Sequence, residues 1–171
     1  LCKLGCCKVK PKVTIGVCVK NCEAFIKDTI ESIIMQDFSH ELMEVIFVDD
    51  GSEDSTLSII RNIVPSMDMC VKVYHQSWKG LGPTRNVVVN NASGNYVVWV
   101  DGDMILSRNY VTKLVEFMER NPNVGVAVGK VEIEPTENLV AFLEIAGFMA
   151  KDSMCNGITS KKFPGTAGSV Y

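Results

Sequence analysis

Hydrophobic residues follow two patterns that alternate along this chain. Five short stretches are almost continuously apolar and rich in β-branched residues, which is typical of strands covered on both faces of a sheet. These stretches are VTIGVCV at 13–19, EVIFV at 44–48, VKVYH at 71–75, YVVWV at 96–100 and VGVAVGKVEI at 124–133. Between them, apolar residues recur every three or four positions, as on one face of a helix. Helices are therefore expected over 23–36, near 57–63, within 80–94, and over 110–120 and 138–149.

This alternation of strands and helices predicts an α/β fold, a Rossmann-like three-layer fold with a mostly parallel central sheet flanked by helices. In such sheets ligands bind outside the carboxyl ends of the strands, at the point where the strand order reverses. Polar residues and glycines gather at the ends of the predicted strands. They occur in KN at 20–21, DDGS at 49–52, WKGLGPTRN at 78–86 and DGD at 101–103. A ligand site is expected at this edge of the sheet.

The DGD motif places two carboxylates directly after a buried strand. Mg²⁺ or Mn²⁺ typically binds one or two carboxylates, keeps several waters, and completes its shell with phosphate oxygens of a substrate. Asp101 and Asp103 could bind such a cation, and Gly102 would leave room for a ligand. The alternative is an ordinary Asx turn or helix cap after a strand.

The motif that starts with DDGS at 49–52 and the glycine-rich loop WKGLGPTRN at 78–86 also allow a structural or a functional interpretation. Ser52 and Asp54 suit the start of a helix, whereas Asp49 and Asp50 could accept hydrogen bonds from a ribose hydroxyl or a base N–H. In the glycine-rich loop, cations and a flexible backbone suit a diphosphate. The alternatives there are a solvated Lys79 and an Arg85 that pairs with one of the acidic loops.

Composition narrows the classes of function. A net charge of −3 and a pI near 5.4 argue against nucleic-acid binding, and no apolar run is long enough to cross a bilayer. Seven cysteines without paired CxxC motifs favour reduced, mostly buried thiols in a cytoplasmic protein over a zinc site. His40 and His75 are expected to be structural or at the surface. Trp78 and Trp99 are expected to pack, although Trp78 could line a pocket.

Taken in order, VTIGVCVKN, ESIIMQDF, EVIFVDDGSEDST, WKGLGPTRN and GNYVVWVDGDM resemble the family 2 glycosyltransferases of the GT-A fold, over residues 12–131. The first strand of that family usually ends in Pro-Thr/Ala-Tyr-Asn, whereas residues 17–21 here are VCVKN. The resemblance implies that Asp101 and Asp103 are catalytic and bind Mg²⁺ or Mn²⁺. The residues that it assigns to the nucleotide are Val17, Cys18, Lys20, Asn21, Asp49, Asp50, Lys79, Gly80, Arg85, Asp101 and Gly102.

The resemblance further implies an inverting, metal-dependent transfer from a nucleotide sugar, with UDP favoured, to an acceptor hydroxyl. The acceptor could belong to a glycan, a lipid carrier or a protein. In the family the catalytic base lies well downstream of the DGD position. We therefore expect an N-terminal extension over 1–11 and a GT-A domain over 12–171 that ends before its acceptor side. Such a chain would bind the donor but turn over slowly or not at all.

Two other functions remain open at this point. A nucleotidyltransferase also combines an α/β sheet with a metal at paired acids, but it usually has a glycine-rich loop after the first strand, where this chain has CVKNCEAF. A non-catalytic nucleotide-binding or receiver-like signalling module also carries acids at its strand ends. We expect a cytoplasmic protein. If the full-length protein lies at the cytoplasmic face of a membrane, we expect the contact to be made only by segments absent from this chain.

Overall fold

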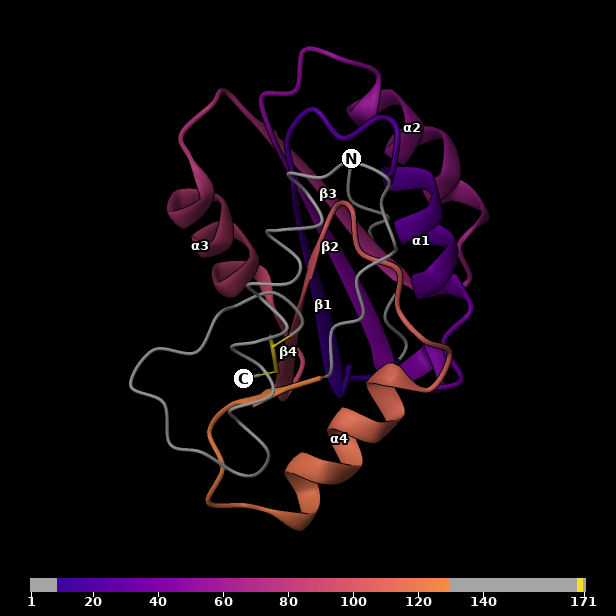
Figure 1. Ribbon diagram of the computed structural model, residues 1–171, viewed down its shortest axis with the longest axis vertical. Helices are drawn as coiled ribbons and strands as arrows, with labels where there is room; N and C mark the ends of the chain where they lie inside the picture. The colour runs from indigo at the N-terminus through magenta and orange to yellow at the C-terminus, as the bar shows by residue number, and fades with distance from the viewer. Residues whose placement is uncertain (1–8, 130–168, 171) are drawn as a thin grey trace, which may run out of the picture. The chain divides into compact units, whose positions relative to one another are not determined.

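The computed structural model describes residues 9–129 and 169–170. Its sheet has the strand order β3-β2-β1-β4-β6-β5 (Figure 1). The first four strands in this order are parallel, and β6 and β5 continue the sheet with antiparallel pairing. The strands are β1 (Val13–Val19), β2 (Met43–Asp50), β3 (Cys70–Gln76), β4 (Tyr96–Asp101), β5 (Ala127–Val128) and β6 (Ser169–Val170).

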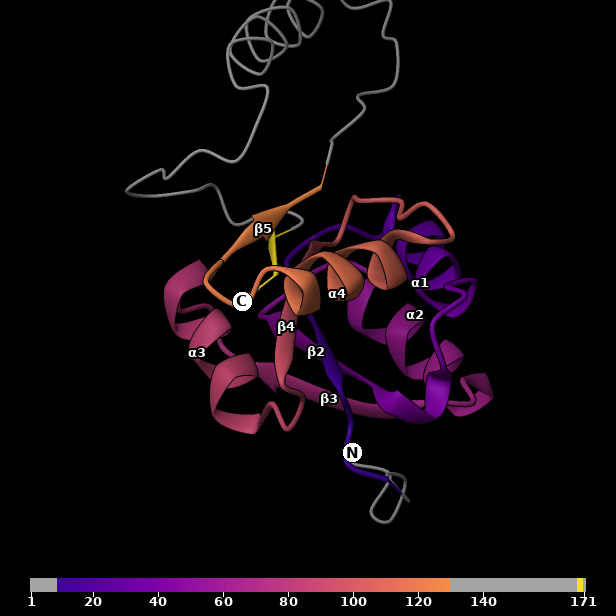
Figure 2. The same ribbon diagram turned by 90° about the horizontal axis from the view of Figure 1, so that it is seen from below.

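Helices cover both faces of the sheet. Helix α3 packs on one face, and α1, α2 and α4 pack on the other, so that the described part of the chain has three layers (Figures 1 and 2). This arrangement confirms the predicted α/β fold. The helices are α1 (Ile26–Ile34), α2 (Thr56–Ile63), α3 (Leu81–Asn91) and α4 (Tyr110–Arg120), with short 3₁₀ helices η1 (His40–Leu42) and η2 (Val64–Ser66).

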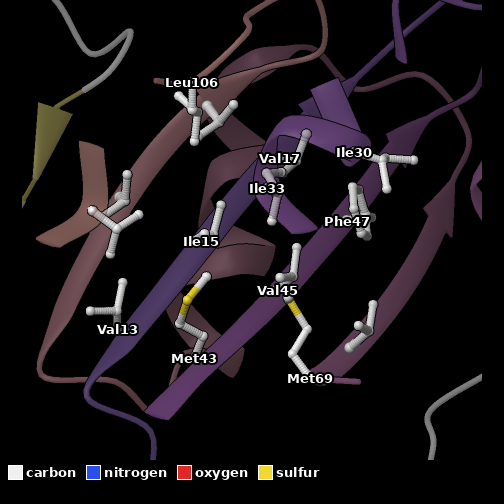
Figure 3. Packing of buried hydrophobic residues seen from close by; sticks show 14 of the residues in the cluster. Val13, Ile15, Val17, Ile30, Ile33, Met43, Val45, Phe47, Met69 and Leu106 are labelled. Carbon is white, nitrogen blue, oxygen red and sulfur yellow. The ribbon is translucent and has the colours of Figure 1, made fainter. Parts of the chain in front are cut away.

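The core explains why the strand sequences do not alternate between apolar and polar residues. All eight residues of β2 are buried, because the strand has a neighbour on each side and helices above and below. On the α1 face, Phe47 packs among side chains such as Ile15 and Ile30 (Figure 3). On the α3 face, a smaller cluster contains Val88 and Trp99.

Gly16 allows α3 to lie close to the sheet. A Cβ atom on Gly16 would lie 2.6 Å from a Val88 methyl group and 3.1 Å from the Trp99 ring. Side chains do not tolerate so short a contact in a close-packed interior. Glycine at this position in β1 therefore sets the distance between the sheet and the helix that precedes the DGD strand.

A buried carboxylate organises the amino-terminal edge of the sheet, opposite the expected site. Glu44 Oε1 accepts hydrogen bonds from Thr14 Oγ1 at 2.6 Å, Ser93 Oγ at 2.8 Å and the Gly94 amide at 3.2 Å, and also from the Ser93 amide. Its other oxygen, Oε2, pairs with Lys72 Nζ at 2.9 Å. These contacts fasten the turn between α3 and β4 to β1 and β2.

Most of the predicted elements match the structure closely. The strand 13–19 and the helix 110–120 have the expected bounds, and β2 is longer than expected at both ends. Helix α1 begins at Ile26, after the expected residue 23, because residues 21–23 bond to another loop. Of the predicted strand 124–133, only Ala127–Val128 is a strand within the described residues. Residues 130–133 and the expected helix 138–149 lie outside them.

In the described ranges, no helix has the length and apolar character needed to cross a membrane. Cys18 and Cys22 are free thiols, as expected. Cys70 is disulfide-bonded, so the expectation of reduced thiols is wrong at this position.

Candidate functional site

The expected site lies at the carboxyl ends of the central strands. The strand order reverses between β1 and β4, which is where α/β sheets bind ligands. Two adjoining hollows of about 260 and 220 Å³ share Cys18, Val19 and Lys20 from the end of β1. The first hollow also contains Asp103, and the second contains Asp50. Lys20 therefore contributes to both hollows, one with an acid from the end of β2 and the other with an acid from the turn after β4.

Asp50 holds the glycine-rich loop in place. Its Oδ1 accepts hydrogen bonds from Gln76 Nε2 at 2.8 Å and the Lys79 amide at 2.9 Å, and its Oδ2 accepts one from the Gly80 amide at 2.8 Å. Burial acts to raise the pKa of Asp50, but these hydrogen bonds outweigh it and lower the pKa. A carboxylate offers about four acceptor positions. Gln76, Lys79 and Gly80 take three of these positions, and Asp50 lines the second hollow with them in place.

Asp49 faces the opposite side of β2. Its side chain is fully buried, and Oδ2 bonds to His75 Nδ1 at 2.7 Å. Oδ1 has no hydrogen-bond partner among the described residues. The described residues that line the two hollows do not include Asp49. Of the two aspartates that the sequence left as alternatives for the base, Asp50 is the one placed at the hollow.

Asn21 belongs to a set of contacts between the loops that follow β1 and β2. Its φ of 50° is in the left-handed region, its amide donates to Ser52 Oγ at 3.0 Å, and its Oδ1 accepts from the Glu53 amide at 2.8 Å. Glu23 exchanges two further hydrogen bonds with residues 54–55. The resemblance assigns Asn21 to the nucleotide. Asn21 lines the first hollow, and its side-chain oxygen also positions the loop that carries Lys20.

The DGD motif forms a turn that directs Asp103 outward. The Met104 amide donates to the Asp101 carbonyl oxygen at 3.1 Å, which closes the turn. Thr29 Oγ1 donates to the Gly102 carbonyl oxygen at 2.9 Å and fastens the turn to α1. A Cβ on Gly102 would lie 2.8 Å from Cys22 Sγ, so this position is tightly packed. Asp103 is exposed and lines the first hollow.

Asp101 lies between a cation and a second carboxylate. Arg85 Nη2, on α3, is 3.8 Å from Asp101 Oδ1, and the Arg85 guanidinium lies 5.4 Å from the centre of the Trp99 ring. Burial raises the pKa of Asp101, Arg85 lowers it, and Asp103 raises it, with a net increase. The pairing of Arg85 with an acidic loop is confirmed. A cation shared by Asp101 and Asp103 would relieve their repulsion.

The carboxylate oxygens of Asp101 and Asp103 suit a hard divalent cation whose remaining ligands are waters and phosphate oxygens. Among the described residues, no group of three or more His, Cys, Asp or Glu side chains is arranged to bind a metal. At phosphate sites, however, the protein usually supplies Mg²⁺ or Mn²⁺ with only one or two carboxylate ligands, and the substrate phosphates and waters supply the others. Cys18 is a poor competitor for the ion, because burial raises its pKa to about 12 and keeps it a neutral thiol.

The remaining predicted residues differ in whether their side chains line the hollows. Val17 is fully buried in the core, so its side chain does not reach the site. Lys79 reaches Asp50 through its backbone amide, and its side chain is exposed. Trp99 packs in the core as expected, but Trp78 is 70 % exposed and lines the second hollow. The sequence signal for Trp78 was its place in the glycine-rich loop.

This fold and this polar strand edge define a GT-A domain. The chain belongs to glycosyl transferase family 2, whose family model matches residues 14–165. Among curated relatives, it is 35 % identical over 125 residues to glycosyltransferase GlyA of Streptococcus pneumoniae, covering 71 % of this chain and 17 % of GlyA. It is 29 % identical over 110 residues to the poly(ribitol-phosphate) β-N-acetylglucosaminyltransferase TarS of Staphylococcus aureus, covering 64 % of this chain and 19 % of TarS.

Two solved structures show the same fold with nucleotide sugars bound. The mannosyltransferase PcManGT of Pyrobaculum calidifontis, in complex with GDP-Man and Mn²⁺, matches with a TM-score of 0.68 and 25 % identity over 73 % of this chain and 37 % of PcManGT. S. aureus TarS 1–349 with UDP-GlcNAc matches with a TM-score of 0.63 and 26 % identity over 74 % of this chain and 37 % of that chain. The chain spans 17 % of the length of GlyA and 38 % of the length of an uncharacterized glycosyltransferase of Haemophilus influenzae, to which it is 32 % identical over 124 residues.

Proposed function

We propose that this chain is the donor-binding part of an inverting, metal-dependent glycosyltransferase that transfers a sugar from a nucleotide sugar, with UDP favoured, to an acceptor hydroxyl. The observation that carries the proposal is the pair of adjoining hollows at the strand switch point, with Asp50 in one, Asp103 in the other and Lys20 in both. One hollow suits the base and ribose, and the other suits the diphosphate with its cation. Residues 12–171 would then belong to a GT-A domain.

Each of these residues has a distinct part in the proposed reaction. Asp101 and Asp103 would hold Mg²⁺ or Mn²⁺, which when bound supplies a Lewis acid that stabilises the charge on the departing diphosphate. Asp50 would accept a hydrogen bond from the base, and Lys20 adds a positive charge between the hollows. Arg85 holds Asp101 in place from α3.

Inversion requires the acceptor oxygen to attack the anomeric carbon from the face opposite the diphosphate, with a base removing its proton. Following the family resemblance, we place that base well downstream of Asp103, outside the described residues. The acceptor hydroxyl could be carried by a glycan, a lipid carrier or a protein. On this proposal, the chain binds the donor without needing the acceptor side.

Calorimetric titration tests the proposal. UDP and GDP would each be titrated with and without Mn²⁺ into the wild type and Asp103→Asn, with Asp28→Asn as the control because Asp28 is an exposed acid on α1. We expect one nucleotide to bind in a metal-dependent manner, the Asp103 variant to lose the metal-dependent part, and the control to behave as wild type. Binding of neither nucleotide, or the same metal-dependent binding by Asp103→Asn, would overturn the proposal.

A further inference from the structure

The Trp78 side chain is exposed and does not belong to either hydrophobic core cluster. It is 70 % exposed, whereas the second tryptophan of the chain, Trp99, is 6 % exposed in the α3 cluster. The Trp78 side chain lines the second hollow together with Leu81, which is 52 % exposed. A large aromatic ring held open to solvent beside a hollow costs hydrophobic free energy in the free protein, and a ligand that covers the ring would recover it.

The backbone around Trp78 is held from two sides. Gly51 has a φ of 74°, and a Cβ on Gly51 would lie 2.8 Å from the Trp78 amide nitrogen, so the two loops are in direct contact. Immediately after Trp78, the amides of Lys79 and Gly80 donate to Asp50. The exposed ring is therefore carried by a loop whose backbone is fixed to the end of β2, which is what a preformed binding surface needs.

Lys20 occupies the neighbourhood of this ring in the structure. Its Nζ lies 5.3 Å from the centre of the Trp78 ring and 3.3 Å from the Gly51 carbonyl oxygen. Both contacts are weak and exposed, so a ligand can displace them at small cost. Lys20 also lines the first hollow, where Asp103 lies. The lysine can thus leave the ring and remain beside a phosphate group.

We propose that Trp78 is the stacking platform for the nucleobase of the donor, and that Lys20 moves from the Trp78 ring to the diphosphate when the nucleotide binds. This inference rests on the proposed function and adds a determinant of affinity to it. Stacking on an aromatic ring is similar for every base. Trp78 would therefore strengthen binding of any nucleotide, and the identity of the base would be read by hydrogen bonds such as one to Asp50.

Fluorescence and affinity together test the inference. The probes are the nucleotide that binds by calorimetry and inorganic pyrophosphate, each with Mg²⁺, because pyrophosphate has no base. We expect the nucleotide to change the emission of the exposed Trp78 and pyrophosphate to leave it unchanged. Trp78→Leu should weaken nucleotide binding roughly 10- to 100-fold, the range expected for loss of one base–aromatic stack, and should leave pyrophosphate binding within about twofold.

Three further variants sharpen the result. Trp78→Phe keeps an aromatic ring and should retain most of the affinity. Val89→Ala, which removes an exposed apolar side chain on α3 that lines neither hollow, should bind as wild type. Lys20→Met should weaken pyrophosphate and the nucleotide by similar factors, because it removes the charge and leaves the stack.

The outcomes separate the inference from the function on which it rests. If the wild type binds a nucleotide but Trp78→Leu weakens nucleotide and pyrophosphate by equal factors, or weakens neither, the stacking role is wrong and the donor site stands. If no nucleotide binds to the wild type, both the donor site and the stacking role are overturned.

Discussion

Replacing Glu44 with glutamine should lower the free energy of unfolding by about 3 kcal/mol at neutral pH. Glutamine keeps an oxygen for the donors that meet Glu44 Oε1, but its amide group would face the Lys72 ammonium in place of Oε2. Breaking a fully buried ion pair by removing one partner costs roughly 3–5 kcal/mol. The lower end applies here, because the Lys72 side chain is 20 % exposed and also donates to the Asn91 carbonyl oxygen.

Urea denaturation followed by circular dichroism measures this loss. Glu116→Gln is the matched control, because Glu116 forms an exposed pair with Arg120 that should contribute less than about 0.5 kcal/mol. Glu44→Gln combined with Lys72→Met should recover part of the stability by removing the unpaired ammonium. A loss below about 1 kcal/mol for Glu44→Gln would refute the view that this ion pair fastens the amino-terminal edge of the sheet.

The same residue predicts a dependence on pH. Burial acts to raise the pKa of Glu44, but hydrogen bonds from Thr14, Ser93 and Lys72 outweigh burial and lower the pKa. A group with a lowered folded-state pKa stabilises the fold above its unfolded-state pKa, about 4.3 for glutamate, and loses this effect as the pH falls through the folded-state value. The difference in unfolding free energy between wild type and Glu44→Gln should therefore shrink below about pH 4.3. A constant difference down to pH 3 would contradict this assignment.

Three further predictions concern the site. Gly51→Ala should cost about 2 kcal/mol in urea unfolding and weaken nucleotide binding, because φ is 74° and the new Cβ meets the Trp78 amide; unchanged stability and affinity would contradict it. Asn21→Gly should lower the free energy of unfolding by about 1 kcal/mol and Asn21→Ala by about 2 kcal/mol. Both variants lose the hydrogen bond to the Glu53 amide, but glycine accepts the φ of 50° and alanine does not. The reverse order in urea unfolding would count against this explanation. Cys18, with a pKa of about 12, should react with iodoacetamide at pH 8 far more slowly in the folded than in the denatured chain, and mass spectrometry of its peptide would reveal any fast labelling.

The sequence alone determined the layers of the fold and the edge that carries the site. Continuous apolar runs marked β1 and β2 because central parallel strands are covered on both faces, and a spacing of three to four residues marked α4. These patterns are local, so they can be read without knowing which segments meet. The polar residues after β1, β2 and β4 then had to share one edge, since parallel strands end on the same side.

Only the tertiary structure decided which of these residues face the site. Successive side chains of a strand point to opposite faces, so the register of β2 buries Asp49 against His75 and leaves Asp50 at the hollow. The bonds of Asn21 and the exposure of Trp78 arise from contacts between loops about 30 residues apart in the chain. Such contacts depend on how separate strands are placed beside one another, which no local pattern of apolar and polar residues records.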